Sequence, residues 1–415
     1  MPRGELDVEE AVQLVRPLAA GIRERGVAAL AEYSKRFDGV VPSNFRVAAA
    51  DLQRSLDQLD PQLKQAFEVA IGRRRQVALA EGWAPEQHVA PDAGARVSVR
   101  TVPVRRVGLY APGGLAPLAS SVLMNVIPAQ VARVSSIAVA SPPQKEFGGL
   151  PHPTVLAMCA LLGVDEVYAV GGAQAIAMFA YGVPGLCEAV DLVTGPGNIF
   201  VVAAKRLLRG VVGIDSEAGP TEIAILADAD ANPAYVAADL ISQAEHDPMA
   251  ASVLVTDSSE LITAVNAQIG QQVAATKHIE RVTTALTGPQ SAAILVRDLE
   301  QGLQVVDAYA AEHLEIQTAN AAQIAASVQN AGAIFVGPYS PVPLGDYTAG
   351  STHVLPTSGT AAFASGLTVR SFMRTIHVVD YSKEALLRVA DVVERFGVAE
   401  DLPAHAFAAT VRRGE

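Results

Sequence analysis

Three short stretches of the chain combine side chains that could bind a metal ion or move protons. The first contains Gln243 and His246, which would share one face of a helix if the helix expected over residues 232–245 continued through them. An amide oxygen and an imidazole nitrogen placed in this way can hold one divalent metal ion. The alternative is a helix end that is polar because water surrounds it, and the spacing alone is compatible with both.

The second stretch places Glu312 beside His313, where a strand is expected over residues 313–317. A carboxylate and an imidazole would supply two general bases close together. Neighbouring side chains of a strand point to opposite faces, so both could serve one substrate only in a loop or a bulge. The alternative is the charged start of an exposed strand.

The third stretch contains Asp346, a single acidic residue between Gly345 and Gly350 in a segment otherwise poor in acid. Glycines let a backbone approach closely, so this carboxylate could be presented as a hard oxygen ligand. An ordinary turn aspartate would explain the same pattern.

Three glycine-containing turns are expected directly after strands and before helices, at residues 113–114, 171–172 and 195–198. In a parallel sheet, this is where phosphate or a nucleotide binds. Tight turns alone would explain each of them, but three turns in one domain favour a ligand site at that edge. The Cys-x-x-Cys, His-Glu-x-x-His, P-loop and Gly-x-Gly-x-x-Gly motifs are all absent from the sequence.

The elements that must position these residues are predicted from about Arg105 onward, where short β-branched runs alternate with alanine-rich helical patterns. This alternation predicts βαβ units, and therefore parallel sheets with helices on both faces. The predicted strands lie at residues 107–110, 137–140, 167–170 and 190–193, and then at 223–226, 252–255, 292–296, 313–317 and 334–336. They form two sets, which predicts two α/β domains.

The rest of the chain is predicted to be helical. In the N-terminal region, residues 1–103, apolar residues recur every three or four positions from Leu52 to Ile71, with Asp51 as the expected N-cap. We expect the two α/β domains at residues 104–222 and 223–376, and a helical tail at residues 377–415.

The composition of the 415-residue chain excludes several classes of protein. Half of the residues are hydrophobic and 18% are charged, so the chain can bury a core and is not disordered. The formal net charge of −12 disfavours binding to nucleic acid or to an anionic membrane. The polar N-terminus shows no signal segment, and no apolar run is long enough to span a bilayer. Cys159 and Cys187 are too few for a disulfide framework and are expected to be buried thiols of a cytoplasmic protein.

Ten motifs make the chain similar to the histidinol dehydrogenase family. They are residues 107–114, 120–129, 171–176, 195–198, 215–222, 242–247, 312–315, 345–347, 353–357 and 404–406. They occur in the order of the family, within a resemblance that extends from about residue 10 to residue 412. The resemblance implies two incomplete Rossmann-like α/β domains with a helical N-terminal region and a small helical C-terminal tail.

The resemblance also implies an activity and its cofactors. The family is zinc-dependent and NAD-linked, and it oxidises L-histidinol first to the aldehyde and then to L-histidine, the last steps of histidine biosynthesis. One zinc ion per subunit would be held by Gln243, His246, Asp346 and His405, with Glu312 and His313 as the catalytic acid–base pair. NAD would contact Tyr110, Gln174 and Asn198. The substrate would contact Thr221 and Glu400 in addition to the metal ligands and the two bases. His405 and Glu400 would reach the active site of the other subunit, which implies a homodimer.

Two alternatives and two departures accompany this resemblance. A zinc hydrolase could use the same ligands and Glu312 to activate water, and a related NAD-dependent dehydrogenase could oxidise another primary alcohol. Against the second alternative, the carboxylate of Glu400 suits the ammonium group of histidinol. Thr221 stands where the family usually has serine, and Thr352 where it usually has asparagine.

Overall fold

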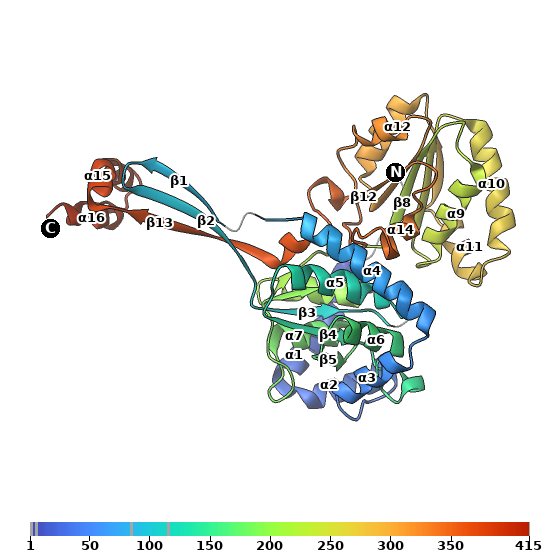
Figure 1. Cartoon of the computed structure of the whole chain (residues 1–415), viewed down its shortest axis with the longest axis horizontal. Helices are drawn as coiled ribbons and strands as arrows, with labels where there is room; N and C mark the ends of the chain where they lie inside the picture. Colours follow the sequence, from blue (N-terminus) through green and yellow to red (C-terminus); the bar gives the residue numbers. More distant parts are fainter. Residues whose placement is uncertain (1–2, 5–6, 84–85, 114–116, 415) are drawn as a thin grey trace. The chain divides into compact units, whose positions relative to one another are not determined.

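The computed structural model describes residues 3–4, 7–83, 86–113 and 117–414 of the chain. They form two compact units. The first comprises Met1–Glu81 and Arg105–Phe372, and the second comprises Gly82–Val104 and Met373–Glu415. Each unit is described separately below, with the element labels of Figure 1.

The first unit contains a parallel five-stranded sheet with the strand order β5-β4-β3-β6-β7. Its strands are β3 (Arg106–Tyr110), β4 (Ser136–Ser141), β5 (Val167–Ala169), β6 (Leu192–Thr194) and β7 (Gly213–Ile214). The connecting helices are α5 (Ala119–Val131), α6 (Pro153–Leu161), α7 (Gly172–Tyr181) and α8 (Ile199–Leu208). The strand order reverses between β3 and β6, which is where a doubly wound sheet commonly binds its ligand.

A second parallel sheet of the same unit repeats this arrangement in the order β10-β9-β8-β11-β12. Its strands are β8 (Glu222–Ala227), β9 (Ala251–Thr256), β10 (Ala292–Leu295), β11 (His313–Gln317) and β12 (Ala333–Val336). The helices are α9 (Pro233–Ala244), α10 (Ser259–Val273), α11 (Ile279–Thr287), α12 (Leu299–Tyr309), α13 (Ala321–Ala325) and α14 (Val342–Tyr347). The predicted α/β fold class, with two parallel sheets joined by helices, is therefore confirmed.

Four N-terminal helices cover the helices of the first sheet. They are α1 (Val8–Arg25), α2 (Val27–Tyr33), α3 (Ala49–Asp57) and α4 (Pro61–Ala80), with a π-helical turn over Ser34–Asp38. Helix α1 packs on α7 and α8, α3 on α6 and α4 on α5. The N-cap predicted at Asp51 was wrong. Ala48 caps α3, and the side chain of Asp60 caps α4 by accepting the amide of Leu63, because Pro61 must begin a new helix.

The second unit is built from an antiparallel sheet and two helices. Its strands are β1 (Glu86–Asp92), β2 (Ala95–Pro103) and β13 (Met373–Tyr381), in the order β1-β2-β13, followed by α15 (Lys383–Ala399) and α16 (Pro403–Thr410). The helical prediction was therefore wrong for residues 86–103 and for the start of the tail. Within β2, Val97 and Val99 alternate with polar or charged residues, as in a strand. The predicted domain boundaries remain predictions.

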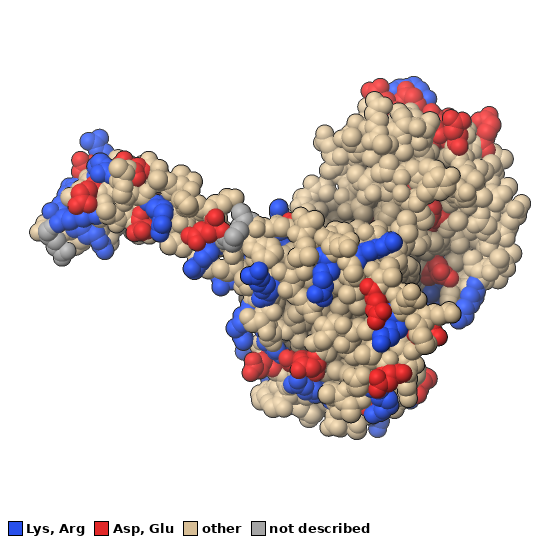
Figure 2. All heavy atoms as spheres, in the orientation of Figure 1, with Lys and Arg blue, Asp and Glu red and all other residues tan. Residues whose placement is uncertain are grey.

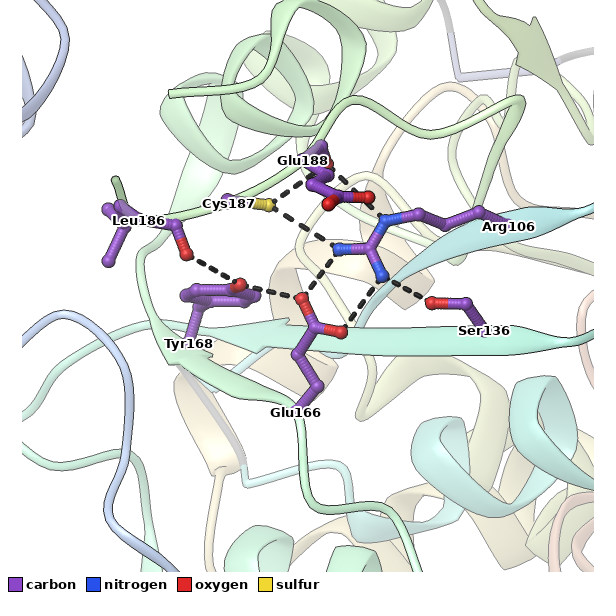
Figure 3. A network of polar contacts seen from close by, with 7 residues as sticks. All are labelled: Arg106, Ser136, Glu166, Tyr168, Leu186, Cys187 and Glu188. Atoms are coloured by element: carbon purple, nitrogen blue, oxygen red, sulfur yellow. Dashed lines mark hydrogen bonds and ion pairs between the residues drawn. The ribbon is translucent and has the colours of Figure 1, made fainter. Parts of the chain in front are cut away.

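A polar network closes the amino-terminal edge of the first sheet (Figure 3). The guanidinium of Arg106 donates to both carboxylate oxygens of Glu166, and the hydroxyl of Tyr168 also donates to that carboxylate. Cys187 lies against Arg106, and burial raises the pKa of its thiol. A cavity of about 670 Å³ opens beside this network. Because its buried polar groups are paired with one another, the network serves to hold the strands together.

Acidic and basic side chains are interspersed on the face of the molecule shown in Figure 2. Among the residues that the structure describes, every helix is too short or too polar to traverse a lipid bilayer.

Candidate functional site

A chain of short hydrogen bonds links three predicted site residues where β8 and β11 begin. The hydroxyl of Thr221 donates to Oε2 of Glu312 over 2.5 Å, and it accepts from Nε2 of Gln243 over 2.5 Å. The backbone amide of Glu222 donates to the same oxygen of Glu312 over 3.0 Å. Threonine and serine both carry a hydroxyl group, and in this chain the hydroxyl of Thr221 makes both hydrogen bonds. The replacement of the family's usual serine by Thr221 therefore preserves these contacts.

Glu312 and His313 both reach this site although they are adjacent in the sequence. Glu312 lies in the bend before β11, where the alternation of a strand does not apply. Its Oε2 is 3.6 Å from Nδ1 of His313. The sequence predicted that both side chains could serve one site only in a loop or a bulge, and the bend at Glu312 is such a loop.

The hydrogen bonding of His313 fixes which ring nitrogen is free. Its Nδ1 lies 3.2 Å from the carbonyl oxygen of Glu222. Because a carbonyl oxygen only accepts, Nδ1 carries the hydrogen and Nε2 keeps its lone pair. Nε2 is buried and has no hydrogen-bond partner among the described residues.

Burial shifts the pKa values of the two bases in opposite directions. It raises the pKa of Glu312 to about 7, although the hydrogen bonds from Thr221 and Glu222 oppose the shift. It lowers the pKa of His313, against the opposing effect of the Asp346 carboxylate. A neutral imidazole and a carboxyl group that titrates near pH 7 are both suited to proton transfer.

Gln243 offers a ligand atom to this site. Its side chain is fully buried on α9, and while Nε2 bonds to Thr221, Oε1 has no partner in the described part of the chain. A buried carbonyl oxygen without a partner is costly, and a cation would satisfy it.

Helix α9 ends at Ala244, and His246 lies beyond it. The prediction that Gln243 and His246 share one face of a helix was therefore wrong. The ring instead donates from Nδ1 to the carbonyl oxygen of Ser242, and this leaves Nε2 free as a ligand. The charge of His246 acts on Glu312, which lies across the site.

Asp346 lies near the end of α14, and its charge acts on Glu312 and His313. A further histidine that the sequence analysis left out of the site, His353, is held by a contact of 3.2 Å between its Nδ1 and the carbonyl oxygen of Asp346. His353 also interacts electrostatically with His246 and His313. His353 begins the family motif at residues 353–357, and this position was the signal in the sequence that could have placed it at the site.

No three His, Cys, Asp or Glu side chains in the described ranges gather closely enough to form a metal cluster by themselves. The predicted ligand set contains only two such side chains in the first unit, His246 and Asp346, because Gln243 is an amide. The fourth predicted ligand, His405, lies on α16 of the second unit, and Glu400 caps α15 there. Both of these side chains are exposed.

The residues predicted to contact NAD lie at the carboxyl ends of the first sheet. Tyr110 ends β3, and its hydroxyl accepts the backbone amide of Gly172. Gln174 is buried in the first turn of α7, and Asn198 caps α8 with its side-chain oxygen. Of the three predicted glycine turns, two are described completely, whereas Gly114 of the third lies outside the described residues.

An acidic side chain from the N-terminal region, Asp38, also approaches this edge of the first sheet. Asp38 ends the π-helical turn, and its Oδ1 would lie 2.9 Å from a Cβ atom at Gly171. Its Oδ2 is buried without a partner among the described residues, and burial raises the pKa of Asp38 to about 6. The carboxylate also contributes to the raised pKa of Tyr110, although burial is the larger cause. A Cβ atom at position 171 would therefore crowd the Asp38 carboxylate and force it to shift.

Two parallel sheets with helices and a buried pair of an imidazole and a carboxyl group give this chain the architecture of an α/β enzyme. A family model described as histidinol dehydrogenase matches residues 1–413. The chain therefore belongs to the histidinol dehydrogenase family, and it is an oxidoreductase, as the sequence predicted.

Individual relatives agree with this assignment. The chain is 64% identical to the histidinol dehydrogenase of Cutibacterium acnes over 100% of this chain and 95% of the relative. It is 60% identical to that of Nocardia farcinica over 99% of this chain and 93% of the relative. It also matches the crystal structure of histidinol dehydrogenase from Elizabethkingia anophelis with a TM-score of 0.93 and 31% identity, over 100% of this chain and 94% of that one.

Proposed function

We propose that the chain is a zinc-dependent, NAD-linked enzyme that oxidises L-histidinol to L-histidine through the aldehyde. The observation that carries this proposal is the free, buried Nε2 of His313 beside Glu312, with the unpartnered oxygen of Gln243 in the same site. A base, a second acid–base group and a ligand atom are what the two oxidations require. Membership of the family supports the choice of substrate.

His313 would act in both oxidations. Its Nε2 accepts the hydroxyl proton of histidinol while the neighbouring C–H bond breaks and its hydride passes to NAD⁺, which leaves the aldehyde. The aldehyde hydrate loses a proton and a hydride in the same manner and becomes the carboxylic acid. The backbone carbonyl of Glu222 keeps the imidazole in the tautomer that these steps need.

Glu312 would act between the oxidations. The aldehyde must add water before it can release a second hydride, and the Glu312 carboxylate removes a proton from that water. Its pKa of about 7 allows it to accept and to release this proton near neutral pH. Thr221 holds the carboxylate in place.

Zinc would be held, one ion per subunit, by Gln243, His246, Asp346 and His405. When bound, zinc supplies a positive centre that anchors the amine and imidazole of the substrate. The free Oε1 of Gln243 and the free Nε2 of His246 support this ligand set. The carboxylate of Glu400 would receive the ammonium group of histidinol.

NAD would bind at the carboxyl edge of the first sheet, against Tyr110, Gln174 and Asn198. The side-chain oxygen of Asn198 is occupied by the amides of Phe200 and Val201, so its contact with NAD would come from its amide nitrogen. The absence of the Gly-x-Gly-x-x-Gly fingerprint from the sequence supports a pose unlike that of a standard dinucleotide site.

The protein would act as a cytoplasmic homodimer with shared active sites. The second unit supports the dimer because Val379, Phe396, Val398 and Phe407 are each more than 60% exposed. A three-stranded sheet and two helices with so much exposed apolar surface fit an interface with another protein chain.

The proposal is tested by mixing the protein with L-histidinol and NAD⁺ and measuring NADH and histidine together. We expect two NADH for each histidine, loss of both after chelation, and recovery when zinc is returned. One NADH per substrate, or turnover of other primary alcohols at the same rate, would point to the related dehydrogenase. Ester or amide cleavage without NADH would point to the zinc hydrolase.

A further inference from the structure

The backbone of Glu222 holds both proposed bases. Its amide donates to Oε2 of Glu312 over 3.0 Å, and its carbonyl oxygen lies 3.2 Å from Nδ1 of His313. Glu222 is the first residue of β8, and it pairs with Ala251 on the β9 side. On the β11 side, the ladder begins one residue later, where Ile223 pairs with His313. The orientation of the two peptide groups that serve the bases therefore depends on what else holds Glu222.

The side chain of Glu222 is buried, and Arg3 is its ion-pair partner among the described residues. Nη1 of Arg3 donates to Oε1 of Glu222 over 3.2 Å, and the two side chains are 21% and 3% exposed. A buried carboxylate that loses its cation is left uncompensated, which is costly. Burial raises the pKa of Glu222 to about 7, and the charge of Arg3 is the largest effect that opposes this rise.

Two further contacts fix the guanidinium group of Arg3. It lies over the ring of Tyr309, with its Cζ 4.1 Å from the ring centre, which is a cation–π contact. It also lies against the backbone of Gly359, where a Cβ atom would be 2.9 Å from Nη1. The chain beside it is close to the second sheet as well, because a Cβ atom at Gly4 would lie 3.0 Å from Pro220, two residues before β8. These contacts direct the charge of Arg3 at the buried carboxylate.

We propose that Arg3 is a positioning residue for the acid–base pair. By holding the side chain of Glu222, it sets the direction of the peptide groups that bind Glu312 and His313. The inference rests on the proposed function, because it concerns the two bases of that same site. Arg3 does not touch the substrate in this role. It acts through Glu222.

The test is a double-mutant cycle of Arg3→Met and Glu222→Gln, followed by the kcat of both oxidations. Arg3→Met leaves a buried carboxylate without its cation, so kcat should fall by about 10–100-fold, a common cost when a group that orients a catalytic residue is lost. The KM for NAD⁺ should not change, because the predicted NAD edge belongs to the first sheet. Glu222→Gln needs no cation, so adding Arg3→Met to it should cost at most a few-fold. Losses that multiply in the double variant would mean that Arg3 does not act through Glu222, and they would overturn the proposal.

Arg25→Met is the matched control. Arg25 also pairs with a carboxylate, that of Glu32 over 2.6 Å, and its Cζ lies 5.8 Å from the centre of a tyrosine ring, that of Tyr33, but it has no contact with β8. Its kcat should equal that of the wild type. A folded Arg3→Met variant with the same kcat as this control would overturn the proposal. If Arg3→Met does not fold, Arg3→Gln replaces it in the cycle, because its amide can donate to Glu222 without carrying a charge.

A second measurement distinguishes this inference from the proposed function. Heteronuclear NMR of the histidine rings shows which nitrogen of His313 carries the hydrogen, and the loss of a signal in His313→Asn assigns it. We expect the Nδ1–H tautomer in the wild type and in Arg25→Met, and a mixture of tautomers in Arg3→Met. If the wild type does not oxidise histidinol, the proposed function fails, and the tautomer alone decides the role of Arg3. An unchanged tautomer in Arg3→Met would overturn the proposal in either case, because a purely structural arginine would lower only the midpoint of unfolding.

Discussion

Backbone carbonyls select the reactive nitrogen of three histidines in the first unit. His246, His313 and His353 each direct Nδ1 to a main-chain oxygen, at 3.1, 3.2 and 3.2 Å. Because a main-chain carbonyl only accepts, the hydrogen of each neutral ring stays on Nδ1, and Nε2 carries the lone pair. This is the form that a metal ligand and a general base both need.

Replacing a predicted ligand should remove the metal. We expect His246→Asn or Asp346→Asn to retain less than one zinc per subunit. The kcat of both oxidations should fall by more than about 100-fold, because losing a ligand costs more than losing a residue that only hydrogen-bonds to a ligand. Metal analysis of the purified variants, together with NADH formation, checks this. A variant with full zinc and normal turnover would remove its residue from the ligand set.

The two bases should separate in single-turnover experiments. His313→Asn should slow NADH formation from histidinol and from the aldehyde alike, because each hydride transfer needs its proton acceptor. Glu312→Gln should leave the first transfer nearly intact and slow the reaction of the aldehyde by about 10²–10⁴-fold, the usual value of a general base. Equal losses with both substrates in Glu312→Gln would mean that Glu312 only orients His313.

Asp38 should make the stability of the chain depend on pH. Its pKa is about 6 in the folded chain against an ordinary value of 3.8, so its contribution is complete below pH 3.8 and is lost as the pH rises through 6. Asp38→Asn cannot ionise, and its stability relative to the wild type should therefore increase between pH 4 and pH 8. We expect about 1 kcal/mol, less than the full shift would give, because solvent reaches part of the group. Urea midpoints of both proteins across this range test it, and a difference that does not change with pH contradicts it.

The site residues show what local sequence can and cannot predict. Spacing suggested that Gln243 and His246 could act together, but it relied on a helix that ends two residues too early. Spacing alone also left Glu312 and His313 open, because their meeting depends on a bend that only the fold defines. The links from Thr221 to Glu312 and from His353 to Asp346 join residues far apart in the chain or in separate elements. Residue types pointed to Glu312 and Asp346, but only the resemblance pointed to Thr221 and to the segment of His353.

Among the elements, the turn after β6 is held by a buried ion pair. Nζ of Lys205 on α8 donates to the carbonyl oxygen of Gly195 over 2.5 Å and to Oδ1 of Asp215 over 2.6 Å. Oδ2 of Asp215 in turn accepts the amide of Gly195. Gly195 has a φ of +116°, and a side chain there would collide with the backbone of Tyr110. The pair therefore locks the turn that leads to Asn198.

Breaking the ion pair between Lys205 and Asp215 should lower both the stability of the chain and its affinity for NAD⁺. Lys205→Met leaves Asp215 buried without its partner, so the free energy of unfolding should fall by about 3–5 kcal/mol, and the KM for NAD⁺ should rise. Arg206→Met is the matched control, because the neighbouring Arg206 forms ion pairs with Glu9 and Glu217 that solvent reaches and that contribute at most about 1 kcal/mol. Denaturant unfolding and NAD⁺ titrations of both variants check this. Equal effects in the two variants would show that the turn does not depend on Lys205.

Elements with strong local patterns were predicted well. The buried parallel strands follow from β-branched runs between glycine turns, and β11 matches its predicted bounds. The errors arose where apolar spacing was ambiguous or weak. One helix was expected where the run Asp60-Pro61 divides α3 from α4, and the exposed strand β1 has no buried face to produce a clear alternation.

At the scale of the whole molecule, the second unit differs from the first because few of its side chains are buried. The first unit contains several apolar clusters around its two sheets, such as those built on Phe179 and on Leu314. In the second unit, β1 is exposed along its whole length, and only three residues of α15 are buried, Ala385, Ala390 and Gly397. Folded domains cover such surfaces, so the exposed apolar side chains of α15 and α16 favour contact with another chain.

A subunit-mixing experiment tests whether another chain completes the site. If His405 of one subunit serves the site of its partner, an inactive His405→Asn chain and an inactive His246→Asn chain should regain activity when they are mixed. In the mixed dimer, one site would collect both substitutions and the other would collect neither. Activity should approach half that of a wild-type dimer for each heterodimer formed, measured as NADH formation after subunit exchange has been verified by mass spectrometry. If His405 served the site of its own chain, every site would carry one substitution, and the mixture would remain as inactive as its parents.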